Sequence, residues 1–447
     1  MPELFELAQS IAAQARPGEE IEAYVARGRD TQIRAFEGKV ESLSSAESAG
    51  VGVRVVRDRR TGFAWVASLG EPAAKEALDE ARDNVAYASE DPYAGLARPD
   101  GVPPAELDLW REELAAMATT EKVELAIELE RQVRASDSRI RQVVAADYAD
   151  GMGESAIATS TGISAGARRS MCQLVVYAVA GEGDDTQTGY GYSVGRSGSD
   201  LDVQKAAGDA VERATRLLGA RKPPSSNLTV ILEPHVTATL LAILAGTLSG
   251  EEVAKGRSLF AGRVGEEVAV PSLTLVDDPT NSAAIGATAS DAEGLAARRN
   301  GLIEGGKLLG FLYDTHSARA AGTVSTGSAV RGGYRTTPRV GARAVAIEPG
   351  SIEPSEILAK VGNGLVVQSI KGVHSGVNAV SGDFSVAAEG LMVRDGELAE
   401  PVREITIASS IQRMMQRVAF IGSDLEWLPG SSAGLTLAID EVSMGGM

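Results

Sequence analysis

The sequence is poor in cysteine and histidine, the two residue types that most often bind zinc. Its 447 residues include one cysteine, Cys172, and three histidines, His235, His316 and His374. A single cysteine excludes a disulfide framework within the chain. No two histidines lie within five residues of each other, so the helical histidine pair of a zincin is absent. Any metal site would have to assemble from distant loops.

Positive charge and long apolar runs are also scarce. Lys and Arg number 43 against 61 Asp and Glu, and the formal net charge of −18 repels nucleic acid. The longest apolar stretch, residues 236–248, is interrupted by Thr237 and Thr239 and is shorter than the ~20 residues that cross a bilayer. The acidic N-terminus lacks the basic region and apolar core of a secretory signal. We therefore expect a cytoplasmic protein with no nucleic-acid partner and no membrane partner.

Glycine, by contrast, is abundant. The chain has 50 glycines in 447 residues, above the usual share of about 7%. Gly28, Gly38, Gly50 and Gly62 follow one another at the spacing of eight to twelve residues that is typical of antiparallel strands joined by turns. We therefore predict turns at these four glycines, with a short strand between each pair.

Helical periodicity and β-rich runs alternate in the first half of the chain. We predict helices at about 3–16, after Pro72, from Thr120 onward, and over 201–218. Strands are predicted at 139–148, 154–161, 171–180 and 186–194. Further along, a strand at 228–232 precedes an apolar helix at 236–248, and the rest is rich in glycine and β-branched residues.

Two proline-rich stretches, 90–109 and 222–226, divide the chain. They predict an N-terminal α/β domain with its linker over 1–110, a central α/β domain over 111–226, and a β-rich C-terminal domain over 227–447. The predicted fold class is α+β, in which N-terminal α/β units precede a large, mostly antiparallel β domain.

Residues 50–54, Gly-Val-Gly-Val-Arg, do not predict a dinucleotide site. They hold two of the three glycines of that motif and continue into a strand, so no helix N-terminus faces a pyrophosphate. A hydrolytic triad of His374, Ser375 and Asp383 is also disfavoured, because adjacent side chains on a strand point to opposite faces.

The other histidine and cysteine positions have structural interpretations. His235 follows a predicted strand end, which indicates a cap-region or hydrogen-bonded surface histidine. Cys172 lies in an apolar strand, where a small buried hydrophobic residue is expected rather than a nucleophile. The residues alone therefore give no self-evident catalytic set.

Several segments nevertheless resemble the TldD/PmbA family of metalloproteases. The N-terminal unit does so at residues 50–55, with 34–41 before them and 62–64 after them. The stretches that resemble the PmbA (TldE) branch lie at 291–294, 325–329, 373–385, 395–397, 401–408 and 443–446. The resemblance spans nearly the whole chain.

This family divides into zinc-bearing TldD subunits, with a His-Glu-x-x-x-His helix and a later cysteine ligand, and TldE/PmbA subunits that lack them. The resemblance places Leu241, Ala242 and Gly246 where the first His, the Glu and the second His would stand. None of these side chains binds zinc or polarises water. The tail after Asp424 also contains no cysteine. The sequence therefore resembles the subunit without zinc, and we expect no cofactor to bind this chain.

The resemblance implies a heterodimer with a TldD-like chain, whose zinc and catalytic base cleave unfolded or modified peptides in a shared chamber. His374, Asn378 and Asp383 are the candidate peptide-binding residues, although strand and turn structure explains them equally well. Two alternatives stay open. One is a homodimeric peptide-binding or scaffold protein without proteolytic activity, and the other is an independent hydrolase that uses His374.

Overall fold

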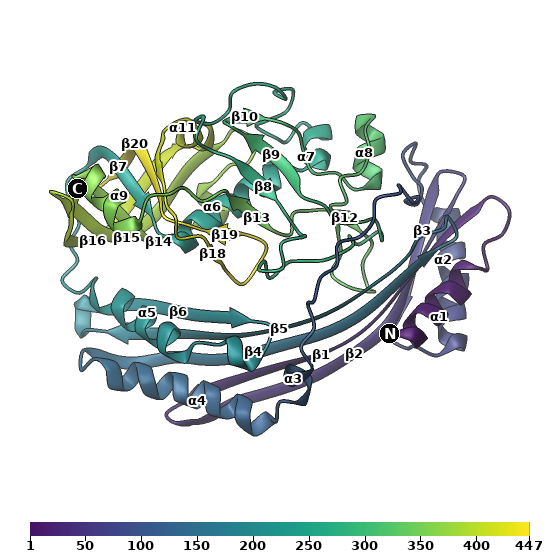
Figure 1. Ribbon diagram of the computed structural model, residues 1–447, viewed down its shortest axis with the longest axis horizontal. Coiled ribbons are helices and arrows are strands. Elements are labelled where there is room, and N and C mark those ends of the chain that lie inside the picture. Colours follow the sequence, from purple (N-terminus) through teal and green to yellow (C-terminus); the bar gives the residue numbers. More distant parts are fainter. Residues whose placement is uncertain (447) are drawn as a thin grey trace.

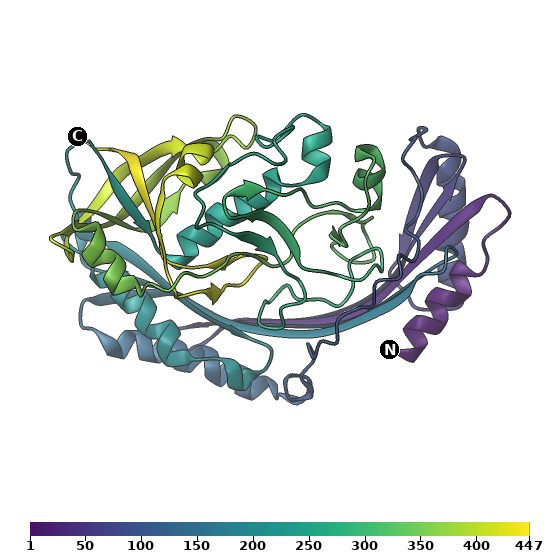
Figure 2. The ribbon, with the colours of Figure 1, turned by 45° about the horizontal axis from the view of Figure 1, so that its top comes forward.

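The computed structural model describes residues 1–446 and confirms the α+β class. A long, curved sheet forms one layer, helices cover its convex face, and the C-terminal domain lies in its concavity (Figures 1 and 2). No helix among the described residues is long and apolar enough to cross a membrane.

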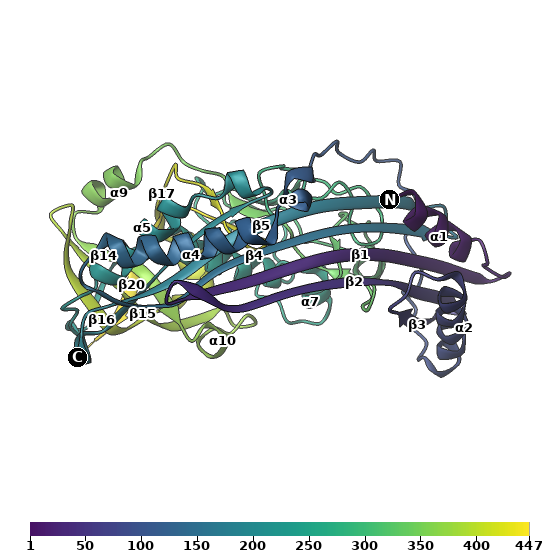
Figure 3. The same cartoon turned by 90° about the horizontal axis from the view of Figure 1, so that it is seen from below.

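The curved sheet has six antiparallel strands in the order β3-β2-β1-β4-β5-β6. Its strands are β1 (Glu19–Phe36), β2 (Lys39–Arg57), β3 (Arg60–Val66), β4 (Ile140–Thr159), β5 (Ser164–Ala180) and β6 (Gln187–Gly195). Figure 3 shows β1, β2, β4 and β5 running side by side along the length of the molecule. Since β1 pairs with β4, the segments before and after residue 110 share one sheet.

The strands are longer than the sequence predicted, and three of the expected turns are wrong. Gly28 lies inside β1, Gly50 inside β2 and Gly62 inside β3, whereas Gly38 does form the turn between β1 and β2. The runs predicted at 139–148 and 154–161 are likewise one strand, β4. A missing side chain at these glycines lets another part of the molecule approach the sheet, and no reversal of the chain is needed.

Tight packing explains several of these strand glycines. A Cβ atom on Gly62 would lie 2.0 Å from the carbonyl oxygen of Ala81 in α2 (Glu71–Tyr87). A Cβ on Gly191 would lie 1.8 Å from the oxygen of Ala206 in α5 (Val203–Thr215). These glycines let the helices lie directly on the sheet, which is the close backbone packing that glycine in a strand permits.

Two apolar clusters attach the helices to the convex face. At one end, α1 (Pro2–Ala12) and α2 pack on strands β1 to β4. At the other end, α4 (Thr119–Ser136) and α5 pack on β1 and β4 to β6, next to the short helix α3 (Glu112–Ala116). Lys122 of α4 reaches the buried Asp150 at 2.5 Å, so each of these buried charges has a partner.

The C-terminal domain contains a small closed sheet. Its strands are β7 (Ser226–Leu232), β14 (Gly364–Lys371), β15 (Asp383–Arg394), β16 (Glu397–Ser410), β17 (Val418–Ile421) and β20 (Leu437–Gly445). The order is β16-β15-β14-β7-β20-β17, and an extra β16–β20 pairing closes the ring. All pairings are antiparallel except β7 with β14. The apolar helix α6 (Pro234–Thr247) packs against β7 and β14, so the predicted helix at 236–248 is confirmed.

A second sheet and short elements complete this domain. The second sheet contains β10 (Lys307–Leu308), β9 (Asn300–Glu304), β8 (Leu275–Asp277) and β13 (Val345–Ile347). The remaining strands are the pairs β11 (Ala329–Val330) with β12 (Arg339–Val340) and β18 (Glu426–Trp427) with β19 (Ala433–Gly434). The remaining α-helices are α7 (Gly250–Ala254), α8 (Thr315–Ala321), α9 (Pro354–Val361), α10 (Val373–Gly376) and α11 (Ile411–Gln416).

The linker between α2 and α3 crosses from the sheet to the C-terminal domain. His316 of α8 lies 2.7 Å from Asp91, and Arg298 lies 2.6 Å from Asp100. Leu96 is fully buried, so the linker is packed as well as wrapped on the surface. These contacts hold the domain in the concavity of the sheet.

Candidate functional site

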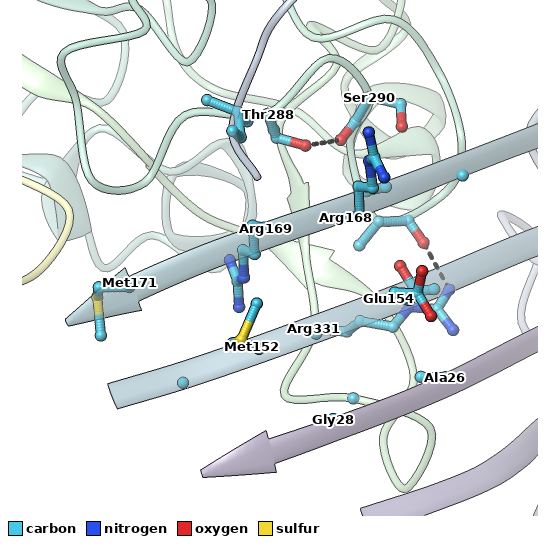
Figure 4. A pocket seen from close by; sticks show the side chains of 18 of the residues that line it. Ala26, Gly28, Met152, Glu154, Arg168, Arg169, Met171, Thr288, Ser290 and Arg331 are labelled. Carbon is cyan, nitrogen blue, oxygen red and sulfur yellow. Dashed lines mark hydrogen bonds between the residues drawn. The ribbon is translucent and has the colours of Figure 1, made fainter. Parts of the chain in front are cut away.

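A cavity of about 1,110 Å³ lies between the concave face of the curved sheet and the C-terminal domain. Its floor comes from β1, β4 and β5, and its other walls come from the loops around 285–292 and 331–335 (Figure 4). The volume exceeds the roughly 300–1,000 Å³ of ordinary small-molecule pockets.

The floor of the cavity is almost free of side chains. Pairing between strands sets Gly28 of β1 opposite Gly153 of β4, and Asp30 opposite Gly151. Alternation along the strands places all four on the concave face. A Cβ on Gly153 would meet only the oxygen of Arg27, at 3.9 Å. A ligand can therefore lie directly on the backbone of the sheet.

The cavity walls are rich in arginine, although the whole chain is acidic. Seven arginines contribute to the lining: Arg27, Arg168, Arg169, Arg196, Arg331, Arg335 and Arg343. Arg27 and Arg168 leave the sheet on its convex face, where Arg27 pairs with Glu154 at 2.6 Å. Arg168 lies 5.7 Å from the centre of the Trp110 ring. The other five arginines surround the space between the sheet and the domain.

Three of these five arginines have partners that fix them. Arg331 donates to Glu22 at 2.7 Å and to the carbonyl oxygen of Ala292 at 2.6 Å. Arg335 lies over the Trp65 ring at 4.9 Å. Arg196 donates to the carbonyl oxygen of Ala284 at 2.6 Å. These contacts join the sheet to the loops of the domain.

Arg169 and Arg343 are different, because neither guanidinium forms a hydrogen bond or ion pair with any residue in the described range 1–446. The buried Nε atom of Arg343 has no hydrogen-bond partner there. Burial lowers the pKa of Arg343, and repulsion from Arg169 lowers it further. Burial and repulsion from Arg111 and Arg169 likewise lower the pKa of Arg196. The two free guanidiniums and Arg196 therefore line one cavity.

A buried ion network closes the end of the cavity near Tyr24. Glu22 lies 2.6 Å from Arg54 and 2.7 Å from Arg331, and all three side chains are buried. Burial alone raises the pKa of Glu22, but the two guanidiniums outweigh it and lower that pKa. Arg54 also lies 3.7 Å from Glu293. This network joins β1 and β2 to the C-terminal domain.

Asp291, next to this network, has the opposite behaviour. Burial and the nearby Glu293 raise the pKa of Asp291 to about 7. Its oxygens accept backbone N–H groups of Glu293 at 2.9 Å, Leu295 at 3.0 Å and Ala329 at 3.1 Å. The carboxyl group therefore organises the loop and is already fully engaged.

The three peptide-binding candidates from the sequence lie outside the lining of this cavity. His374 is exposed on the one-turn helix α10, so the strand expected there is wrong. The Oδ1 atom of Asn378 accepts the backbone N–H of Val380 at 2.9 Å. Asp383 accepts the hydroxyl of Ser381 at 2.7 Å. Asn378 and Asp383 thus stabilise the turn before β15, as their turn interpretation predicts.

Leu241, Ala242 and Gly246, the positions that correspond to the zinc motif, lie on helix α6. Leu241 is buried, whereas Ala242 and Gly246 are exposed and one turn apart. None of the three carries a donor atom for a metal. Among residues 1–446, no group of three or more His, Cys, Asp and Glu side chains could hold a metal ion. The residues present therefore do not fit zinc, and no chemical step is assigned to zinc on this chain.

His235 and Cys172 are both buried. Burial, followed by repulsion from Arg213, lowers the pKa of His235 to about 3. Neither of its ring nitrogens has a hydrogen-bond partner within residues 1–446, and its ring lies 4.7 Å from that of Tyr190. His235 lies in the first turn of α6, so the expected cap-region position is confirmed, whereas the alternative of a surface histidine is wrong. Burial raises the pKa of Cys172 to about 12, which fits its predicted role as a buried hydrophobic residue.

The sequence interpretation missed the arginine-lined cavity. Its floor was hidden because the sequence predicts a turn at Gly28, and its lining comes from residues as far apart in the sequence as Tyr24 and Arg343. One signal was present: Gly151 and Gly153 alternate inside a β-rich run, and on the neighbouring strand β5 they pair with Met171 and the exposed Arg169. Alternate glycines in a strand indicate a bare sheet face.

Known proteins match the chain along nearly its whole length. Models of PmbA/TldA metallopeptidase domain 1, central domain and C-terminal domain match residues 21–85, 112–218 and 225–446. Metalloprotease PmbA of Escherichia coli O157:H7 is 29% identical, over 97% of this chain and 94% of the relative. A metalloprotease of Methanothermobacter thermautotrophicus is 27% identical, over 89% of this chain and 86% of the relative's own length. The crystal structure of TldE from Thermococcus kodakarensis has the same fold, with a TM-score of 0.90 at 24% identity and 100% coverage of both chains. This chain therefore belongs to the PmbA/TldD family.

Proposed function

We propose that this chain is the PmbA/TldE-like subunit of a cytoplasmic TldD/TldE-type zinc metallopeptidase. A TldD-like partner brings the zinc and the catalytic base, and this chain shapes the chamber and binds unfolded or modified peptides. The complex is a heterodimer in this proposal.

The observation that carries the proposal is the face of α6 that holds Ala242 and Gly246. The resemblance places the Glu of the His-Glu-x-x-x-His motif at Ala242 and its second His at Gly246, and residues one turn apart on a helix lie on the same side. The first His corresponds to Leu241, which is buried. On this chain that exposed face offers only a methyl group and a backbone. The family membership predicts proteolysis, so the missing donors must be supplied by another chain.

The cavity supports the binding part of the proposal. It is large, and its glycine floor admits a polypeptide backbone at van der Waals distance. A surface that contacts a ligand mainly through backbone accepts many sequences, as a peptidase for unfolded substrates requires.

The test is co-expression of this chain with a TldD-like chain from the same genome. We expect a complex with one zinc per heterodimer by elemental analysis, which degrades a casein-like unfolded substrate. The matched control replaces the first motif histidine of the TldD-like chain with alanine, and we expect this change to remove both zinc and proteolysis. This chain alone should do neither.

Three outcomes would overturn the proposal. Proteolysis by this chain alone without metal would contradict it, and its loss in His374→Ala would identify the independent hydrolase instead. A stable homodimer with no affinity for the TldD-like chain would favour the scaffold protein without proteolytic activity. Zinc bound by this chain alone would show that it has a ligand set of its own.

A further inference from the structure

We propose that the arginine-lined cavity binds peptides through a carboxylate, which Arg169 and Arg343 hold while the peptide backbone lies on the glycine floor. This inference deepens the proposed function and rests on it, because it names the chemistry of the peptide that the chain would take. The carboxylate belongs either to the C-terminus of the peptide or to an Asp or Glu side chain.

The first step of the argument is the positive charge that the structure leaves unpaired. A guanidinium stays protonated in proteins, so Arg169 and Arg343 keep their charges even though they repel each other. Burying such charges without an anion is unfavourable, and buried polar groups in native proteins normally have partners. The unpartnered Nε of Arg343 therefore points to an anion that is bound when the cavity is filled.

The nearby carboxyl groups do not supply that anion. Asp277 accepts the backbone N–H groups of Arg343 at 2.9 Å and Ala344 at 2.7 Å. Asp291 accepts three backbone N–H groups, and its raised pKa leaves it partly protonated near neutral pH. Neither lies within ion-pair distance of Arg169 or Arg343 in the described chain.

The geometry of the floor favours an extended peptide segment as the ligand. Strand pairing sets Gly28, Gly153 and Arg169 in one row across β1, β4 and β5. Neighbouring strands are about 4.8 Å apart, so the row spans about 10 Å from a bare backbone to an arginine. A peptide segment crosses this row with its carboxylate at the Arg169 end. Guanidinium groups bind carboxylates with two parallel hydrogen bonds, which fixes that end.

The charge pattern disfavours a polyanion. The chain carries a net charge of −18, and Asp30 adds a carboxylate to the floor one row away from Arg169. A nucleic acid would meet both, whereas a peptide with one carboxylate meets only the arginines. Binding of single-stranded DNA in preference to peptides is therefore an outcome that overturns the proposal.

The experiment measures the binding of labelled nine-residue peptides to the isolated full chain by fluorescence anisotropy at low and high salt. The four probes are a neutral peptide with an amidated C-terminus, the same peptide with a free C-terminus, an amidated peptide with central glutamates, and its lysine counterpart. We expect at least one carboxylate-bearing probe to bind about tenfold more tightly than the amidated neutral probe, with a preference that salt reduces. Of the free C-terminal probe and the glutamate probe, the one that binds more tightly identifies the source of the carboxylate.

Matched variants test the residues. Arg169→Gln should abolish the preference, and Arg169→Lys should retain only part of it, because lysine keeps the charge but cannot form the two parallel hydrogen bonds. Arg141→Gln changes an exposed arginine of β4 that lies outside the cavity lining and should alter affinity less than twofold. Arg343→Gln should act like Arg169→Gln. If Arg343→Gln does not fold, Gly153→Val replaces it, since a Cβ at this position would have only the oxygen of Arg27 near it, at 3.9 Å, and the valine side chain would occupy the floor.

The proposal is overturned if the wild-type chain binds all four probes equally, if Arg141→Gln and Arg169→Gln have the same effect, or if a single-stranded DNA of similar length binds more tightly. Thermal unfolding of each variant confirms that it is folded. Binding is measured without the TldD-like chain, so failure of the zinc complex to assemble leaves this result standing. Absence of peptide binding would equally leave the assembly test unaffected.

Discussion

Replacement of Glu22 by glutamine should strongly destabilise the fold. Glu22 lies at 2.6 Å from Arg54 and 2.7 Å from Arg331, and its side chain is 2% exposed. Glutamine keeps the shape but removes the negative charge, which leaves two buried guanidiniums without compensation. Breaking a buried pair in this way costs about 3–5 kcal/mol, and the nearby Glu293, 3.7 Å from Arg54, offsets part of that cost. We expect a loss of about 3 kcal/mol in the free energy of unfolding.

The assay is urea unfolding of the full chain, followed by circular dichroism. Glu154→Gln is the matched control, because Glu154 also pairs with an arginine from a neighbouring strand, at 2.6 Å, but Arg27 is largely exposed. An exposed pair contributes about 1 kcal/mol or less. In a double-mutant cycle, Glu22→Gln with Arg331→Gln should cost less than the sum of the single changes, because the second removes an unpaired charge.

The pH dependence gives an independent check. The folded-state pKa of Glu22 is lowered, so its contribution to stability is present above the ordinary pKa of 4.5 and is lost as the pH falls through the folded value. Glu22→Gln should remove that loss. A stability loss below about 1 kcal/mol, or one equal to that of Glu154→Gln, would refute the assignment of Glu22 as the residue that joins sheet and domain.

Three further predictions concern single residues. Gly191→Ala should destabilise the fold by about 1–3 kcal/mol, since the new Cβ would lie 1.8 Å from the oxygen of Ala206 in α5. Gly208 lies on α5 with open space around it, so Gly208→Ala should stabilise the fold by up to about 1 kcal/mol. Equal effects of the two changes in urea unfolding would contradict this prediction. Asp291 ionises at about 7 when folded and at its ordinary 3.8 when unfolded, so its contribution to stability falls as the pH rises through that interval, and Asp291→Asn should flatten the change. His235 has a folded pKa of about 3, so the chain should lose stability as the pH falls below 6.5, and His235→Phe should abolish that loss. Thermal unfolding across the pH range tests both titrations, and an unchanged slope in either variant would refute its assignment.

The helices and the C-terminal β structure could be predicted from local pattern because their signals are local. The helix at 201–218 has regular apolar spacing, and the observed α5 covers Val203–Thr215. The apolar helix α6 was predicted for the same reason. Leu241, Ala242 and Gly246, which the resemblance assigns to the zinc motif, all lie on this helix.

The long strands could not be predicted, because their residues are neither apolar nor alternating where the sheet is bare. Residues 39–48 of β2 are exposed throughout and rich in serine, alanine and glutamate. Gly28 and Gly153 have the composition of turns, yet they form the floor of a cavity. The arginine cluster was hidden for another reason. Arg169 and Arg343 line the same cavity only because the C-terminal domain packs on the curved sheet, and no local sequence pattern encodes that packing.

The pairing of β1 with β4 also has a consequence for synthesis on the ribosome. Glu22 pairs with Thr159, so β1 waits for roughly 140 further residues before its partner strand exists. At the usual 5–20 residues per second, this delay is roughly 7–30 s. During it, the hairpin of β1 and β2 exposes an unpaired strand edge, which is a hazard for aggregation. The polar, charged stretch at 39–49 then protects the nascent chain, which gives the weakest β signal in the sheet a role in its production.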